Sequence, residues 1–190
     1  MSAVWKVPAL PPPDPETVLL YARGRHAEGV DELLEDVIRE GNAAMEPRLC
    51  FDEYGVEISG DVVDFGDFRV RSRDLAAHLA GYRRAVLFAA TAGARADRLI
   101  ARAERTSPAR ALLLDALFSE RVEALCNAFT AVYNDPSRRF SAGYGDLPLA
   151  FQREIFRVLD VPRRIGVTLG DQLLMMPTKS VTAIIGKKEG

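Results

Sequence analysis

The segment 139–144, Arg-Phe-Ser-Ala-Gly-Tyr, holds the side chains in this sequence best suited to binding a small ligand. The guanidinium of Arg139 can hold a carboxylate through two parallel hydrogen bonds, and the ring of Tyr144 offers a stacking face. Gly143 and Gly145 let the backbone approach a ligand closely. These parts suit a small amphoteric molecule. On composition alone, however, an ordinary glycine turn before the helix that follows Pro148 explains the segment better.

The rest of the sequence gives little support for self-sufficient catalysis. The two histidines are His26, expected in a loop, and His78, expected at the end of a short helix. Each is better explained as an ordinary surface or capping residue than as a catalytic base. The sequence lacks a Gly-x-Ser-x-Gly elbow, a His-Glu-x-x-His helix and the common glycine-rich phosphate-binding and dinucleotide-binding patterns. We therefore expect a binding module.

Length, charge and cysteine content narrow the class of protein. A chain of 190 residues with 48% hydrophobic residues is long enough for one globular domain with its own core. The formal net charge of −2 gives no reason to expect nucleic acid as a partner. Cys50 and Cys126 lack zinc-type spacing and are expected to be buried thiols in a reducing compartment. Because no apolar run is long enough to span a membrane, we expect a cytoplasmic protein without a membrane partner.

The first part of the chain is predicted to contain two helices followed by short strands. Asp14 can cap a helix that begins at Pro15 and runs to about Arg23. Apolar residues over 30–38 recur at helical spacing, and this second helix is expected to stop near Gly41 or Asn42. Short β-type runs punctuated by glycine and aspartate follow and indicate antiparallel strands. They lie over 49–51, 55–58, 62–63 and 68–70.

The second part of the chain is predicted to surround one long helix. Ser72 can cap a short helix over 75–79, and the apolar run 85–90 is expected to be a buried strand that leads through Gly93 into another helix. Ser107 with the following proline opens the longest helix, whose apolar positions keep helical spacing over roughly seven turns. The remaining predicted elements are a helix over 149–159 and strands over 165–169 and 181–185.

These elements do not alternate as repeated βαβ units. We therefore predict an α+β fold, a single domain with a mainly antiparallel sheet flanked by helices. The domain is expected to span residues 14–186. Residues 1–13, which contain a run of three prolines, are expected to be a flexible tail, and residues 187–190 a second tail.

Several motifs follow one another in the last third of the chain. They are Arg139-x-x-x-Gly143-Tyr144, then Asp146-Leu-Pro148, a helix, Ile165-Gly-Val-Thr-Leu169, and Met175-Met176-Pro-x-Lys-Ser-Val-x-Ala-Ile-Ile-Gly186. In this order they resemble the reactivation (activation) domain of cobalamin-dependent methionine synthase. The segments 72–79, 87–93 and 114–124 are similar to small stand-alone members of that family. The resemblance covers roughly residues 15–186.

The resemblance implies a bent antiparallel sheet with flanking helices, in agreement with the α+β prediction. It also implies a module that binds S-adenosylmethionine and faces a cobalamin-carrying partner, either a corrinoid-binding protein or the cobalamin domain of methionine synthase. A flavodoxin-type reductant is the implied electron donor. The implied function is to assist reductive reactivation of the partner by methylation, as an accessory to that methyltransferase in methionine biosynthesis. No acid–base residue is needed, because the sulfonium and the cobalt carry the chemistry.

Roles for the loop residues follow from the resemblance position by position. Arg139 is implied to grip the methionine carboxylate of the ligand. Gly143 and Tyr144, with the backbone at Phe140 and Ala142, are implied to shape the adenosine side of the site. Ala142 stands where the family usually has proline, a change that loosens the turn but keeps its groups.

Three further residues have weaker assignments. Glu123 is a candidate partner for a polar or cationic part of the ligand, although a solvated helix glutamate explains it equally well. Met175 and Met176 could offer a soft apolar surface to the corrin, and core packing explains them better. The segment 170–172, Gly-Asp-Gln, replaces the family's usual Thr-Glu-Ser before these methionines.

Two alternatives stay open at this point. The first is a non-catalytic interaction module that keeps the contact with a corrinoid protein but has lost S-adenosylmethionine binding. The second is a methyltransferase that acts on some other acceptor, which requires a second substrate pocket.

Overall fold

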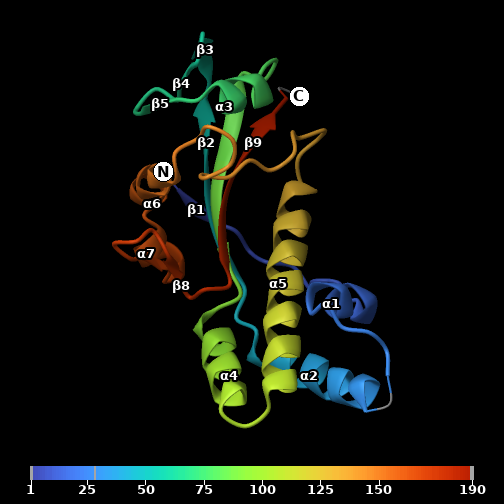
Figure 1. Ribbon diagram of the computed structural model, residues 1–190. Helices are drawn as coiled ribbons and strands as arrows, with labels where there is room; N and C mark the ends of the chain where they lie inside the picture. The colour runs from blue at the N-terminus through green and yellow to red at the C-terminus, as the bar shows by residue number, and fades with distance from the viewer. Residues whose placement is uncertain (1, 28, 189–190) are drawn as a thin grey trace.

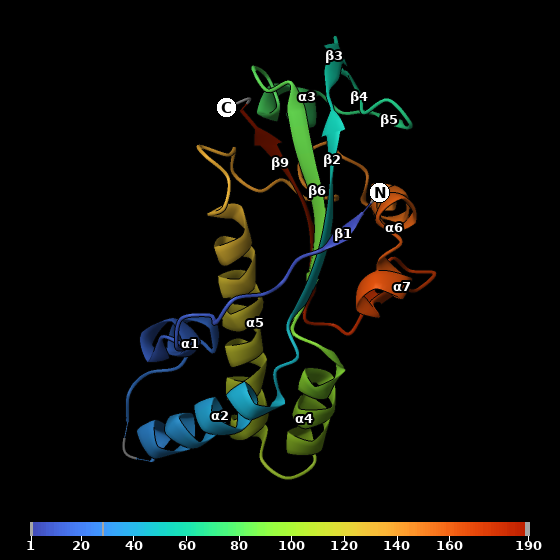
Figure 2. The same cartoon turned by 180° about the vertical axis from the view of Figure 1, so that it is seen from behind.

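A four-stranded antiparallel sheet forms the centre of the molecule. The computed structural model describes residues 2–27 and 29–188. The strand order is β1 (Ala3–Val4), β2 (Arg48–Gly55), β6 (Arg84–Thr91) and β9 (Ser180–Lys187). The last three strands pair along their whole length, so β9 is an edge strand of this sheet. Figures 1 and 2 show these strands as a long, bent ribbon.

Helices cover both faces of the sheet, which explains why β6 is apolar along its length without alternation. On one face, α5 (Pro108–Thr130) packs Leu125, Cys126 and Phe129 against the sheet. On the other face, the sheet packs against α6 (Gln152–Leu159) and α7 (Val161–Ile165). The two views in Figures 1 and 2 place α5 on one side of β9 and α6 on the other.

The N-terminal helices form a second core against the first half of α5. They are α1 (Pro15–Tyr21), α2 (Val30–Ala44) and α4 (Ala94–Glu104). Asp14 caps α1, and Ser107 caps α5 by accepting a hydrogen bond from the Arg110 amide, both as the sequence predicts. Helix α2 continues past its predicted end, to Ala44, and Gly41 lies inside the helix, where α2 packs against α5. A Cβ at Gly41 would lie 2.3 Å from Leu117.

The remaining small elements form two groups: one lies at the upper end of the sheet, between β2 and β6 in the chain (Figure 1), and the other precedes β9 in the chain. A three-stranded sheet comprises β3 (Glu57–Ser59), β4 (Val62–Asp64) and β5 (Arg69–Arg71), and α3 (Arg73–His78) follows it. The 3-10 helix η1 (Leu149–Phe151) precedes α6, and β7 (Thr168–Leu169) pairs with β8 (Met175–Met176).

The predicted strand over 165–169 was wrong in its first half. Residues up to Ile165 belong to helix α7, which has Pro162 in its first turn and ends at Gly166 with a φ of 74°. Only Thr168–Leu169 is extended. Both Ile165 and Val167 are buried in the core, so a helix end and a strand can bury the same short apolar run.

The N-terminal segment was expected to be a flexible tail, and this expectation was also wrong. Strand β1 pairs with β2, and the ring of Trp5 lies edge-on to Phe129 with 5.3 Å between the ring centroids. The Arg121 guanidinium donates a hydrogen bond of 2.5 Å to the carbonyl of Pro11. At the other end, β9 runs through Lys187 into the predicted tail, and residues 189–190 lie outside the described residues.

Within the described parts of the chain, none of the helices combines enough length with enough hydropathy to cross a bilayer.

Candidate functional site

The 137–144 loop runs antiparallel along the free edge of β9. Phe140 and Ile184 exchange two backbone hydrogen bonds of 2.9 Å and 2.7 Å. The hydroxyl of Ser141 donates to the carbonyl of Thr182 at 2.8 Å, and the amide of Ser137 donates to the carbonyl of Gly186 at 3.0 Å. The loop is therefore positioned by the sheet itself.

Two glycines with positive φ shape the turn that follows. Gly143 has a φ of 89°, and its amide donates to the carbonyl of Leu147 at 2.9 Å. Gly145 has a φ of 53°, and a Cβ at this position would lie 2.0 Å from a carboxylate oxygen of Asp74. Glycine is required at 145 both for the backbone conformation and for the close approach to α3.

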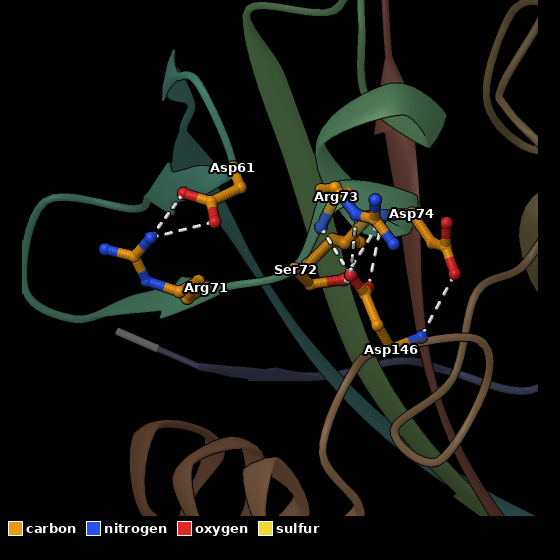
Figure 3. Close-up of polar contacts among 7 residues, drawn as sticks. Asp61, Arg71, Ser72, Arg73, Asp74 and Asp146 are labelled. Atoms are coloured by element: carbon orange, nitrogen blue, oxygen red, sulfur yellow. Dashed lines mark hydrogen bonds and ion pairs between the residues drawn. The ribbon is translucent and has the colours of Figure 1, made fainter.

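Asp146 fastens the turn to the start of α3 (Figure 3). Its carboxylate accepts hydrogen bonds from the Ser72 hydroxyl at 2.5 Å and from the amides of Arg73 and Asp74 at 2.9 Å and 3.2 Å. In return, the Asp74 carboxylate accepts from the Asp146 amide at 3.0 Å. The pKa of Asp146 is lowered, first by the bond from Ser72 and then by the two amides.

The strand that enters α3 is held in the same way (Figure 3). Arg71 donates to both carboxylate oxygens of Asp61 at 2.8 Å, and the amide of Ser72 donates to the carbonyl of Asp61 at 2.7 Å. The anchor for the loop is therefore itself fixed to the small sheet.

A pocket of about 600 Å³ lies beside the loop. Its walls come from α5, the loop, the first residue of α6, Met175 and the 180–183 half of β9. Val181 and Ala183 contribute to the core beneath α5, whereas Thr182 has the same side-chain parity as Ile184, which belongs to the core beneath α6. The pocket therefore extends around the edge of β9, from one face of the sheet to the other.

An ion pair lies at the α5 side of the pocket. One terminal nitrogen of Arg139 donates to the carboxylate of Glu123, and both side chains are partly exposed. The other terminal nitrogen of Arg139 is buried and has no hydrogen-bond partner. Cys126, one turn along α5 from Glu123, has its pKa raised to about 12 by burial, with the positive charge of Arg139 acting in the opposite direction.

Within residues 2–27 and 29–188, three buried side-chain polar atoms lack a hydrogen-bond partner, and all three belong to residues that line this pocket. They are Nη1 of Arg139, Oε1 of Gln152 and Oγ1 of Thr182. A buried polar group without a partner costs about 1–3 kcal/mol, and such groups are few in native proteins. Their concentration in one pocket indicates a place for a polar ligand.

The loop residues singled out from the sequence divide into two groups. Arg139, with Glu123 of α5, lines the pocket, and so does Tyr144, whose residue surface is 60% exposed. Phe140, Ala142 and Gly143 are not among the lining residues; their backbone hydrogen bonds and core packing hold the loop in place. Ala142 is buried, and the Phe140 ring lies 5.1 Å from the ring of His78.

Only one of the two methionines lies at the pocket. Met175 lines the pocket, whereas Met176 is 62% exposed and lies outside the lining. The histidines have structural partners: His26 contacts Asp31 and Glu16, and His78 contacts Ser137 and the carbonyl of Arg138.

Sequence reasoning missed Gln152 and Thr182. Gln152 is 7% exposed and Thr182 is 2% exposed. One signal was available, because Thr182 is a polar residue inside the otherwise apolar run 181–185. Gln152 had no such signal, since a glutamine in the first turn of a helix is ordinary.

Comparisons with known proteins support the fold. No protein-family model matches the sequence, and a search of curated proteins finds no match. A solved structure that matches is the crystal structure of the MetH reactivation domain bound to AdoHcy, with a TM-score of 0.66 and 14% sequence identity. This chain has the fold of that reactivation domain. The match covers 84% of this chain and 65% of the other, so this chain spans about two thirds of its length.

The match confirms two predictions at the level of the fold. These are the resemblance to a methionine synthase reactivation domain and the α+β class with a mainly antiparallel sheet flanked by helices.

Proposed function

We propose that this chain is a binding module for S-adenosylmethionine and its demethylated product, S-adenosylhomocysteine. The observation that carries the proposal is the state of Arg139. Its guanidinium holds Glu123 with one nitrogen and leaves a second, buried nitrogen without a partner in the pocket. An α-carboxylate supplies the acceptor that this nitrogen lacks, and charge-assisted bonds to arginine are among the stronger hydrogen bonds in proteins.

The paired charges suit the amino-acid end of such a ligand. A free α-amino acid carries a carboxylate and an ammonium on neighbouring atoms, and the pocket offers the guanidinium of Arg139 beside the carboxylate of Glu123. Arg139 would hold the carboxylate and Glu123 the ammonium. The pocket volume of about 600 Å³ lies within the usual range for small-molecule sites.

The exposed ring of Tyr144 is suited to stack against an aromatic group at another part of the ligand. The Tyr144 side chain lines the pocket from the turn that Gly143 and Asp146 fix in place. Because this anchoring restricts the turn before binding, stacking of an adenine on Tyr144 would cost little conformational entropy. The solved structure of similar fold is described as bound to AdoHcy, a ligand of this class.

The finer part of the proposal is that the ligand serves reductive reactivation of a cobalamin-carrying protein. In that reaction a one-electron reductant of the flavodoxin type reduces Co(II), and the sulfonium methyl passes to the reduced cobalt, leaving S-adenosylhomocysteine. This chain would bind and orient the sulfonium and exclude water. Exposed apolar side chains fit contact with a partner: Tyr144 lines the pocket, and Leu174 and Met176 flank the lining residue Met175 in the chain.

Thermal unfolding tests the binding step. A ligand that binds only the folded state raises the Tm in proportion to the logarithm of its concentration above Kd. We expect millimolar S-adenosylhomocysteine to raise the Tm of the wild-type chain and to raise the Tm of Arg139→Ala by clearly less. An equal shift in both proteins, or no shift in the wild type, would overturn the proposal.

The reactivation step needs a separate assay. A cobalamin-loaded corrinoid-binding domain in the Co(II) state, reduced flavodoxin and S-adenosylmethionine are mixed with the chain, and the absorption spectrum is followed. Formation of methylcobalamin that depends on the chain and on Arg139 supports reactivation. Binding to the cobalamin domain without any S-adenosylmethionine affinity selects the non-catalytic interaction module instead.

A further inference from the structure

Gln152 and Thr182 carry the other two unpartnered oxygens among the residues that line the pocket. Thr182 pairs with Ala89 of β6, and both residues share the sheet face that α6 covers. Gln152 is the first residue of α6. Arg139 and Glu123 lie instead at the α5 side. The two groups of polar residues are therefore separated by the edge of β9.

The fold itself provides no partner for this second pair. Across from Thr182 in the sheet stands Ala89, and Ser141 donates to the Thr182 carbonyl instead of its hydroxyl. Gln152 is flanked along its helix by Phe151 and Ile155, which belong to the apolar core. Both side chains are more than nine-tenths buried, so burial has removed them from bulk water without giving their free oxygens a protein partner.

The chemistry of the two oxygens limits what they can hold. The amide oxygen of Gln152 only accepts hydrogen bonds, whereas the hydroxyl of Thr182 can donate one. A donor and an acceptor side by side complement this pair. The 6-amino edge of adenine offers an amino donor next to a ring-nitrogen acceptor.

We infer that Gln152 and Thr182 hydrogen-bond the 6-amino edge of the adenine of an S-adenosyl ligand. The inference rests on the proposed function and adds the residues that hold the base. A ligand that satisfies both groups of polar residues lies across the edge of β9, with its amino-acid end at Arg139 and its base at Gln152. Tyr144, on the loop between them, offers the stacking face.

Calorimetric titration with S-adenosylhomocysteine tests the inference on the full chain. Gln152→Met and Thr182→Val keep side-chain size and remove the polar atoms, and Gln172→Met serves as a matched exposed control. Removing one hydrogen bond to a ligand inside a buried site weakens binding by about tenfold or more. We expect that reduction in both pocket variants and no change in the control.

The two possible failures are distinguishable. Tight binding of S-adenosylhomocysteine by the wild type, with the same affinity in Gln152→Met and Thr182→Val, would overturn the base assignment alone. Absence of binding by the wild type would overturn the proposed function and the base assignment together.

The stability of the ligand-free variants gives a second readout. Removing an unpartnered buried hydroxyl takes away a desolvation cost, so Thr182→Val should melt at the same temperature as the wild type or above it. A lower Tm for Thr182→Val would mean that the hydroxyl has a structural partner, and the inference would then be wrong.

Discussion

Asp74 and Asp146 each accept a hydrogen bond from the other's backbone amide, at 3.0 Å and 3.2 Å. Asp74 belongs to the first turn of α3, and Asp146 belongs to the turn that follows the 139–144 loop (Figure 3). This reciprocal contact joins residues 72 positions apart in the chain. It ties the glycine-containing turn, and with it Tyr144, to the small sheet.

The charge of Asp146 should stabilise the protein in a pH-dependent way. The native pKa of Asp146 is lowered by the bond from Ser72 and the amides at the start of α3, whereas the unfolded value is about 3.9. Its contribution is therefore fully present above pH 4 and is lost as the pH falls through the native pKa. We expect Asp146→Asn to lower the Tm by a few degrees at pH 7 and by progressively less below pH 4. A Tm difference that stays constant down to pH 2 would contradict this role.

Gly145 should tolerate a side chain less well than a glycine of similar backbone conformation. Gly60 has a φ of 61° with open space around it, so Gly60→Ala measures the cost of the left-handed conformation, about 1 kcal/mol. Gly145→Ala carries that cost and must also displace Asp74. We expect its free energy of unfolding, measured in urea, to fall further than that of Gly60→Ala. Equal losses would show that the turn moves away from α3 freely.

The N-terminal segment should contribute to the stability of the fold although its only regular element is the two-residue strand β1. Trp5 is the single tryptophan, and its ring packs on Phe129 at the centre of the α5 face. We expect Trp5→Ala to cost about 2 kcal/mol in urea unfolding, because it removes an aromatic contact from a partly buried site. Leu20→Ala, at a side chain that is mostly exposed, is the control and should cost much less. Similar values for the two variants would indicate that the segment is not docked.

Both thiols should be unreactive in the folded protein. Burial raises the pKa values of Cys50 and Cys126 to about 12, so almost no thiolate exists at pH 8 and reagents cannot reach the sulfur. We expect iodoacetamide to modify neither residue in buffer and both in denaturant, as read by mass spectrometry. Rapid modification of Cys126 in buffer would mean that the α5 side of the pocket opens.

Much of the fold could be predicted because its elements carry local signals. Ser107 with a following proline marks the start of α5, and the uninterrupted apolar run of β6 marks a strand covered on both faces. The first half of residues 165–169 was assigned wrongly because the spacing of apolar residues cannot separate a helix end from a strand over five residues. Pro162 and Gly166 were the available signals for the helix.

The candidate site could be predicted only in part. Arg139, Tyr144 and Glu123 were found through motifs, and the structure brings all three to one pocket. The placement of Gln152 and Thr182 at the pocket depends on the pairing of the loop with β9 and on the packing of α6, which are tertiary relationships. A threonine in an apolar strand gives no sign of whether its hydroxyl will find a partner.

The central claim is that Arg139 holds the carboxylate of an S-adenosyl ligand, and calorimetric titration with S-adenosylhomocysteine tests it most directly. Arg98→Ala, which removes an exposed arginine of α4, is the charge-matched control. A hydrogen bond to a charged group contributes about 1.5–3 kcal/mol, so we expect saturable binding by the wild type and Arg98→Ala and a loss of at least about tenfold in Arg139→Ala. No saturable heat at millimolar ligand, or equal affinity in Arg139→Ala and the wild type, would contradict the claim.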